Sequence, residues 1–104
     1  IIMKYTVCDY EAARELYLYV NNNYAVYQQL LQVFKALNRK ATKGQYNSEK
    51  TCKAFEYAVK DGAIRYTQEF ATGPYYNIFN AATRREVCRK IEATERESIM
   101  KGDF

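Results

Sequence analysis

The residues of this chain best suited to bind a partner are six cations gathered between positions 35 and 53. With Glu49 as the one acid among them, they give this stretch a net charge of +5, against +4 for the whole chain. Such a concentration of positive charge favours an anionic partner, which is either nucleic acid or an acidic protein surface. We call these side chains the basic segment: Lys35, Arg39, Lys40, Lys43, Lys50 and Lys53.

The spacing of the basic segment indicates that its members gather at one end of a helical bundle. Lys35, Arg39 and Lys43 recur every four residues and therefore share a helix face. The last two lysines open the next expected helix, and Tyr46 lies between the two groups. A ring flanked by cations is common at nucleic-acid interfaces, where bases stack on the ring and phosphates pair with the cations. The alternative is a solvated helix end with Tyr46 packed on the core.

Arg84 and Arg85 begin a second basic group, which Arg89 and Lys90 extend. Two glutamates lie within reach of these cations along the same expected helix. The group is therefore either a second contact surface or a face covered by ion pairs within one helix.

A short aromatic loop, Gly73-Pro74-Tyr75-Tyr76, is a further candidate for partner contact. Exposed rings on a loop favour protein–protein binding, so Tyr75 and Tyr76 are candidate contact residues. The alternative is that this loop and the apolar residues after it close the end of the bundle.

Side chains suited to catalysis or metal binding are scarce. The chain contains no His, the commonest general base and metal ligand. Its three cysteines are too far apart for a zinc-site spacing, and its glycines form no phosphate-loop pattern. Glu92 and Glu95 are expected on a solvated helix face, in ion pairs with neighbouring cations. We therefore predict no enzyme activity, no cofactor and no metal ion.

Hydrophobic periodicity predicts an all-α fold, with residues 1–104 as a single domain. We expect a small bundle of about four helices, in which the middle pair forms an antiparallel hairpin. Gly62 within the third helix is expected to mark a close helix crossing. A fourth helix is opened by Asn80 or by a capping box at Thr83 and Glu86. The first three expected helices cover residues 10–20, 24–43 and 48–70.

The two ends of the chain differ in character. Residues 1–8 are apolar and are expected to form a short extended arm, whereas residues 93–104 are expected to form a charged helix end or tail in solvent or on a partner. Both features permit a homodimer. No apolar run approaches the roughly 20 residues that a membrane-spanning helix needs. An odd number of cysteines favours reduced thiols and an intracellular protein.

Several short motifs between residues 22 and 92 form a pattern. They are Asn22-Asn23-Tyr24, Lys43-Gly44-Gln45-Tyr46, Glu49-Lys50, Lys53-Ala54-Phe55-Glu56-Tyr57, Tyr66, Glu69-Phe70 and Arg84-Arg85-Glu86-Val87. With this pattern the chain resembles small helical proteins of unknown function encoded by tailed phages and other mobile elements. It departs from that family at residues 75–76, near which the family often has a Trp or His. An aromatic contact survives this change, whereas a His-dependent role does not.

The resemblance implies the origin of the chain more than its activity. Small accessory proteins of phages commonly bind and block host machinery, including restriction and CRISPR effectors. We therefore expect a non-enzymatic accessory protein in the cytoplasm of a bacterial host. It is expected to bind a host protein or ribonucleoprotein complex and to inhibit a defence system. The alternative is a small protein that binds DNA or RNA directly through the basic segment.

Overall fold

Five helices make up the described part of the chain in this computed structural model, which describes residues 7–71 and 79–104. Neither described range contains a strand. The all-α class is therefore confirmed, and the described residues contain five helices where about four were expected. Most of the expected N-terminal arm lies outside these ranges. The helices are α1 (Tyr10–Asn22), α2 (Tyr24–Thr42), α3 (Ser48–Ala54), α4 (Glu56–Glu69) and α5 (Ala81–Lys101).

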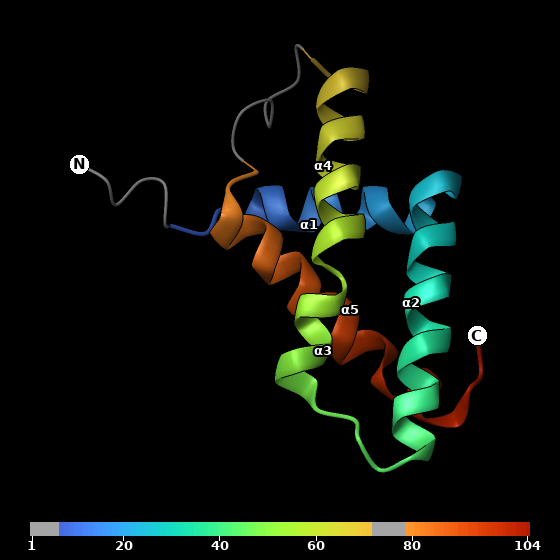
Figure 1. Ribbon diagram of the computed structural model, residues 1–104. Coiled ribbons are helices and arrows are strands. Elements are labelled where there is room, and N and C mark those ends of the chain that lie inside the picture. The colour runs from blue at the N-terminus through green and yellow to red at the C-terminus, as the bar shows by residue number, and fades with distance from the viewer. Residues whose placement is uncertain (1–6, 72–78) are drawn as a thin grey trace.

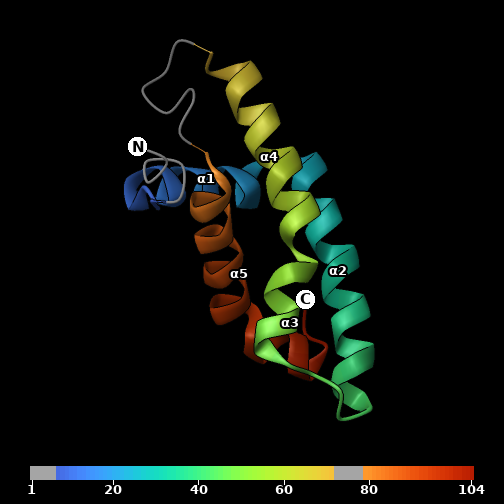
Figure 2. The same cartoon turned by 60° about the vertical axis from the view of Figure 1, so that its left-hand side comes forward.

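The helices form a flat body with extents of 43 × 31 × 17 Å. In Figure 1, α1 lies across the other helices, and the chain runs down α2 and returns upward through α3 and α4. In the view of Figure 2, α3 and α4 stand between α5 and α2. Helix α5 contacts each of the other four helices.

Polar caps define three of the helix starts that the sequence indicated. The side chain of Asp9 accepts a hydrogen bond from the backbone N–H of Ala12 at 3.0 Å, and Asn47 caps α3 in the same way. Asn23 separates α1 from α2 with a single extended residue, and its side chain accepts from the N–H of Val26 at 3.1 Å. The turn between the first two helices is therefore tighter than the expected gap at residues 21–23.

The expected third helix is divided at Phe55 into α3 and α4. The N–H of Phe55 bonds to the carbonyl of Cys52, three residues back, so the helix tightens and changes direction here. This bend accompanies complete burial of the Phe55 ring, which packs edge-on against Phe34 with ring centroids 5.7 Å apart. Local periodicity does not reveal such a break, because the break is stabilised by the long-range contact between Phe55 and Phe34 of α2.

Gly62 lies where α4 crosses the end of α1, as the sequence indicated. A Cβ built on Gly62 would approach Cγ1 of Val20 to 2.5 Å, so only glycine fits at this crossing. Val20 and its neighbour across the turn, Val26, are both fully buried. The Val20 side chain therefore packs directly against the α4 backbone at Gly62.

The start of α5 confirms one of the two expected openings of this helix. Asn80, and not the proposed capping box, caps the helix by accepting from the N–H of Thr83 at 2.8 Å. Thr83 is buried, and its hydroxyl accepts a hydrogen bond from the backbone N–H of Asp9. At the other end, Ile99 is fully buried, and its carbonyl accepts a hydrogen bond from Asn38 of α2 at 2.8 Å. Residues 93–101 therefore form the expected charged helix end, and Ile99 packs this end on the body of the same chain.

Candidate binding surface

All six members of the basic segment are exposed, and none forms an ion pair within the described residues. Three of them lie on the last two turns of α2, Lys43 caps that helix, and the other two lie on α3. Gly44 allows the chain to turn between them because it adopts a positive φ of 69°. Residues 35–53 therefore present unneutralised positive charge around a single turn.

Tyr46 does not join this surface as a free ring. It is half-buried, and its hydroxyl donates a hydrogen bond to Oε2 of Glu92 on α5 at 2.7 Å. Burial and the neighbouring Glu92 carboxylate raise the pKa of Tyr46 to about 12. The prediction that Tyr46 stacks on a base is therefore not supported, and the alternative that the ring packs on the body describes its position.

Glu92 is the buried acid beneath Tyr46, which corrects its expected place on a solvated face. Its side chain is only 4% exposed and accepts two hydrogen bonds from the Arg96 guanidinium, at 2.7 and 2.8 Å. The Arg96 hydrogen bonds lower the pKa of Glu92 more than burial raises it, and Tyr46 and Ser48 add to the lowering. The carboxylate is therefore held ionised by its partners and ties the residue 43–48 turn to α5.

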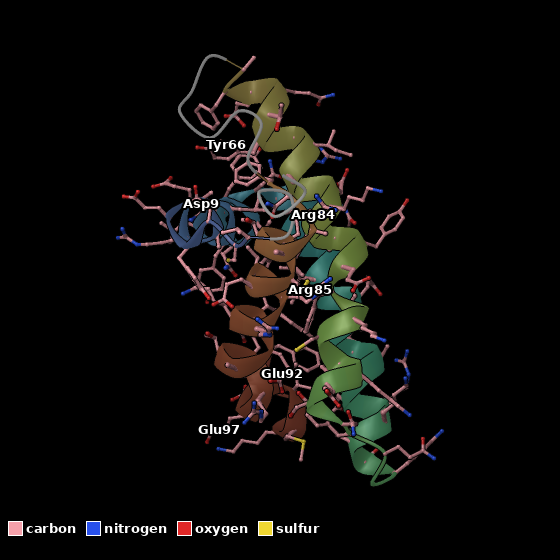
Figure 3. All side chains as sticks on the ribbon, turned by 90° about the vertical axis from the view of Figure 1, so that its left-hand side faces the viewer. Asp9, Tyr66, Arg84, Arg85, Glu92 and Glu97 are labelled. Carbon is pink, nitrogen blue, oxygen red and sulfur yellow. The ribbon has the colours of Figure 1, made fainter. Side chains whose placement is uncertain are left out.

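Arg84 and Arg85 lie on the first turns of α5, between the ribbons of α5 and α4, with Glu92 further along the same side (Figure 3). The Arg84 guanidinium donates a hydrogen bond to the carbonyl of Phe79, so part of this side chain is engaged at the start of the helix. Arg85 is exposed and forms no ion pair within the described residues. Within the part of the chain that the structure describes, Arg89 is the member of the extended second group that has an ion pair, with Glu86 at 3.3 Å.

Three adjoining hollows follow the line between α5 and the helices α3 and α4. The first, of about 390 Å³, and the second, of about 280 Å³, share Lys60 and Arg84 in their walls. The second and third, the latter of about 240 Å³, share Glu56 and Arg85. Because neighbours share wall residues, the three hollows adjoin one another along this line, and we call them together the α4–α5 groove.

This groove brings together predicted residues that lie far apart in the sequence. Lys53 of the basic segment and Arg85 of the second basic group line the same hollow. Lys60 is a cation of the groove that the sequence reasoning missed, although it lies seven residues after Lys53, a spacing that keeps two residues on one helix face. The walls of the groove carry five cations and two carboxylates. The cations are Lys53, Lys60, Arg84, Arg85 and Arg89, and the carboxylates are Glu49 and Glu56.

Tyr75 and Tyr76 of the predicted aromatic loop lie outside the described residues. The expected third helix ends at residue 70, and α4 ends at Glu69. The loop therefore stays a candidate on sequence grounds alone.

The thiols and carboxylates of the described residues form no cluster of three or more groups that could hold a metal ion. All three cysteines are free, and Cys52 and Cys88 line the third hollow of the groove. Burial, together with nearby carboxylates, raises the pKa of each of the three thiols, that of Cys88 to about 12. These thiols are therefore protonated near neutral pH and are poor nucleophiles.

Comparisons with family models, curated proteins and solved structures give no match. Within the described residues, no helix is long and apolar enough to cross a membrane. The resemblance to small phage proteins stays a prediction, and the surface itself carries the functional argument.

Proposed function

We propose that this chain is a non-enzymatic protein that binds an anionic macromolecular target through the basic segment. The observation that carries the proposal is that all six cations are exposed without an ion pair among the described residues. A cation already paired within its own chain is partly neutralised, whereas an unpaired one is available to the carboxylates or phosphates of a partner.

An antiparallel hairpin of the middle helices suits this use of the surface. We propose that α2 and the α3–α4 pair act as an antiparallel hairpin, with residues 43–47 as its turn. A hairpin turn displays the ends of both helices on one side, so the cations of α2 and α3 reach the same partner. The bond from Tyr46 to Glu92 holds that turn against α5, which limits the conformational entropy lost on binding.

The resemblance to small phage proteins suggests where this binding takes place. We propose a phage or mobile-element accessory protein that acts in the cytoplasm of a bacterial host, binds a host protein or ribonucleoprotein complex, and inhibits a defence system such as a CRISPR or restriction complex. Such complexes contain surfaces that handle nucleic acid or carry acidic patches, and a basic protein competes for the acidic ones. A homodimer that uses the chain termini is compatible with this setting.

An infection assay tests this proposal in cells. The chain is produced in bacterial strains that each carry one characterised CRISPR or restriction system, and phage plating is counted with and without it. We expect plating to rise in at least one strain and to fall back with the double charge reversal Arg39→Glu and Lys43→Glu. Unchanged plating in every strain would contradict the defence setting, and full activity of the double variant would contradict the assigned surface.

Direct binding of DNA or RNA through the basic segment is the second candidate. The density of unpaired cations supports it, because phosphate contacts supply most non-specific affinity. The position of Tyr46 counts against it, since the one ring within the segment is engaged with Glu92. The decisive observation is salt dependence: a phosphate-binding segment loses affinity steeply as salt rises, and Arg39→Glu with Lys43→Glu flattens that response.

A further inference from the structure

We propose that the α4–α5 groove binds the backbone of a single-stranded nucleic acid, with Tyr57 as a stacking platform for a base. This site is distinct from the basic segment, with which it shares only Lys53, so the two can be tested separately. The inference goes beyond the proposed function, because the basic segment can bind its target whether or not the groove is occupied.

The charge distribution in the groove suits a chain of phosphates. Lys60 and Arg85 are both exposed, have no ion pair among the described residues, and line the middle hollow from opposite helices. Lys53 adds a third such cation in the next hollow. Positive charge therefore recurs along the groove and on both walls, as needed for a ligand with one negative charge per repeat.

The shape of the groove favours a single strand over a duplex. Its wall residues on α3 and α4 run from Glu49 to Gln68, which corresponds to less than about 30 Å of helix and suits a site of roughly four nucleotides. Each hollow is no larger than about 390 Å³ and lies between two helices, so a flexible strand can enter where the convex backbone of a duplex cannot. A single strand also leaves its bases free to stack.

Tyr57 supplies the ring that the basic segment lacks. Its side chain is 83% exposed on the first turn of α4, three residues before Lys60. Residues at that spacing are neighbours on a helix surface, so the ring lies next to Lys60 at the edge of the groove, outside the walls of the three hollows. An acidic peptide could also pair with Lys60 and Arg85, but it offers no base for this ring to stack on.

The test is fluorescence anisotropy with a labelled single-stranded oligothymidylate of about twelve nucleotides, long enough to fill the groove. We expect affinity to fall with salt with a log–log slope of about −2 to −3, which corresponds to three to four phosphate contacts on a single strand. A duplex of the same length should bind more weakly at every salt concentration. Absence of binding at low salt, or equal binding of the duplex, would overturn the inference.

Two groove variants separate charge from stacking. Lys60→Gln with Arg85→Gln should lower affinity at least about tenfold and reduce the magnitude of the salt slope by about 1.4. Tyr57→Ala should lower affinity roughly fivefold to a hundredfold and leave the salt slope unchanged. Because all three side chains are exposed, thermal melting should show that both variants stay folded.

Matched controls lie outside the groove. Lys35→Gln with Arg39→Gln changes the net charge equally in the basic segment, and Tyr24→Ala removes a ring on α2 that is 77% exposed. Both controls should lose less affinity than their groove counterparts, and equal losses would overturn the assignment to the groove. Complete competition by polyglutamate at matched charge would assign the groove to acidic protein instead and would also contradict the inference. Failure here leaves the proposed function standing if the infection assay still responds to Arg39→Glu with Lys43→Glu.

Discussion

The hydroxyl of Tyr46 donates a 2.7 Å hydrogen bond to the buried carboxylate of Glu92, forty-six residues further along the chain. This bond joins the turn after α2, which carries the basic segment, to the middle of α5, which forms a wall of the α4–α5 groove. The basic segment and the α4–α5 groove are therefore linked through the buried, ion-paired carboxylate of Glu92. Loss of this hydrogen bond should lower the free energy of unfolding and also leave the turn after α2 less firmly held.

Replacement of Tyr46 by Phe should lower the free energy of unfolding by roughly 1–3 kcal/mol, because a charged acceptor inside the protein loses a donor. Urea unfolding at pH 7 measures the change. Tyr24→Phe, at a highly exposed ring, serves as the control and should have no measurable effect. Equal stability of Tyr46→Phe and the wild-type chain would show that water replaces the hydroxyl at no cost.

The same hydrogen bond predicts a loss of stability in alkaline solution. The pKa of Tyr46 is raised from 10 to about 12 in the folded chain, so the folded state holds a proton that the unfolded state releases. Its contribution is fully present below pH 10 and is lost as the pH rises towards 12. Unfolding measured across this window should show a smaller decline for Tyr46→Phe than for the wild-type chain, and parallel declines would refute this linkage.

Glu92 predicts the opposite dependence in acid. The hydrogen bonds from Arg96 hold the pKa of Glu92 below its ordinary value of 4.5 in the folded chain. Its contribution to stability is therefore present above pH 4.5 and is lost as the pH falls through the lower folded value. Arg96→Ala should reduce this acid dependence and lower stability at pH 7, because the buried Glu92 carboxylate loses its two hydrogen bonds from the guanidinium.

The control for Arg96 is Lys101→Ala, which removes an ion pair to Glu97 whose members are both exposed. Exposed pairs contribute less than about 1 kcal/mol, so this variant should unfold almost as the wild-type chain does. Equal losses in the two variants would mean that the burial of Glu92 has no energetic consequence.

Gly62→Ala should destabilise the fold by about 1–3 kcal/mol despite the higher helix propensity of Ala, because the added methyl group has no room beside Val20. Val20→Ala removes the obstructing methyl groups at a cost of its own. The double variant should be more stable than the sum of the two single losses predicts, as a double-mutant cycle in urea would show. Additive losses would indicate that the crossing relaxes without strain.

Cys88 should react slowly with alkylating reagents at neutral pH. Its thiol is buried, and burial, with help from the Glu56 charge, raises the pKa to about 12. Mass spectrometry after brief iodoacetamide treatment should find Cys88 unmodified in the folded chain and modified in urea. Rapid labelling of the folded chain would show that the third hollow of the groove opens to solvent.

Local signals predicted much of this fold. The helix starts expected near residues 10, 24 and 48, and the expected opening at Asn80, each coincide with a side chain that satisfies a free backbone N–H, and this requires only neighbouring residues. Gly62 was also readable, since a glycine inside a helix costs stability unless another element approaches closely.

Features that depend on long-range contacts could not be predicted from the local sequence. Glu92 reads as a surface residue until Tyr46 and Arg96 are placed around it, and the break at Phe55 depends on a ring contact with Phe34. The exposure of the basic segment could be predicted, because lysine and arginine side chains are rarely buried. Its junction with the groove at Lys53 required the packing of α3 against α5.

Co-purification of a partner with the tagged chain from infected or element-carrying bacterial cells tests the central claim most directly. The wild-type chain is compared with Arg39→Glu plus Lys43→Glu, and with Arg14→Glu plus Lys101→Glu, which changes the net charge equally at exposed sites outside the basic segment. We predict a defined partner that the wild-type chain and the second variant retain and that the first variant loses. Retention of the same partner by all three proteins would contradict the assignment of binding to the basic segment.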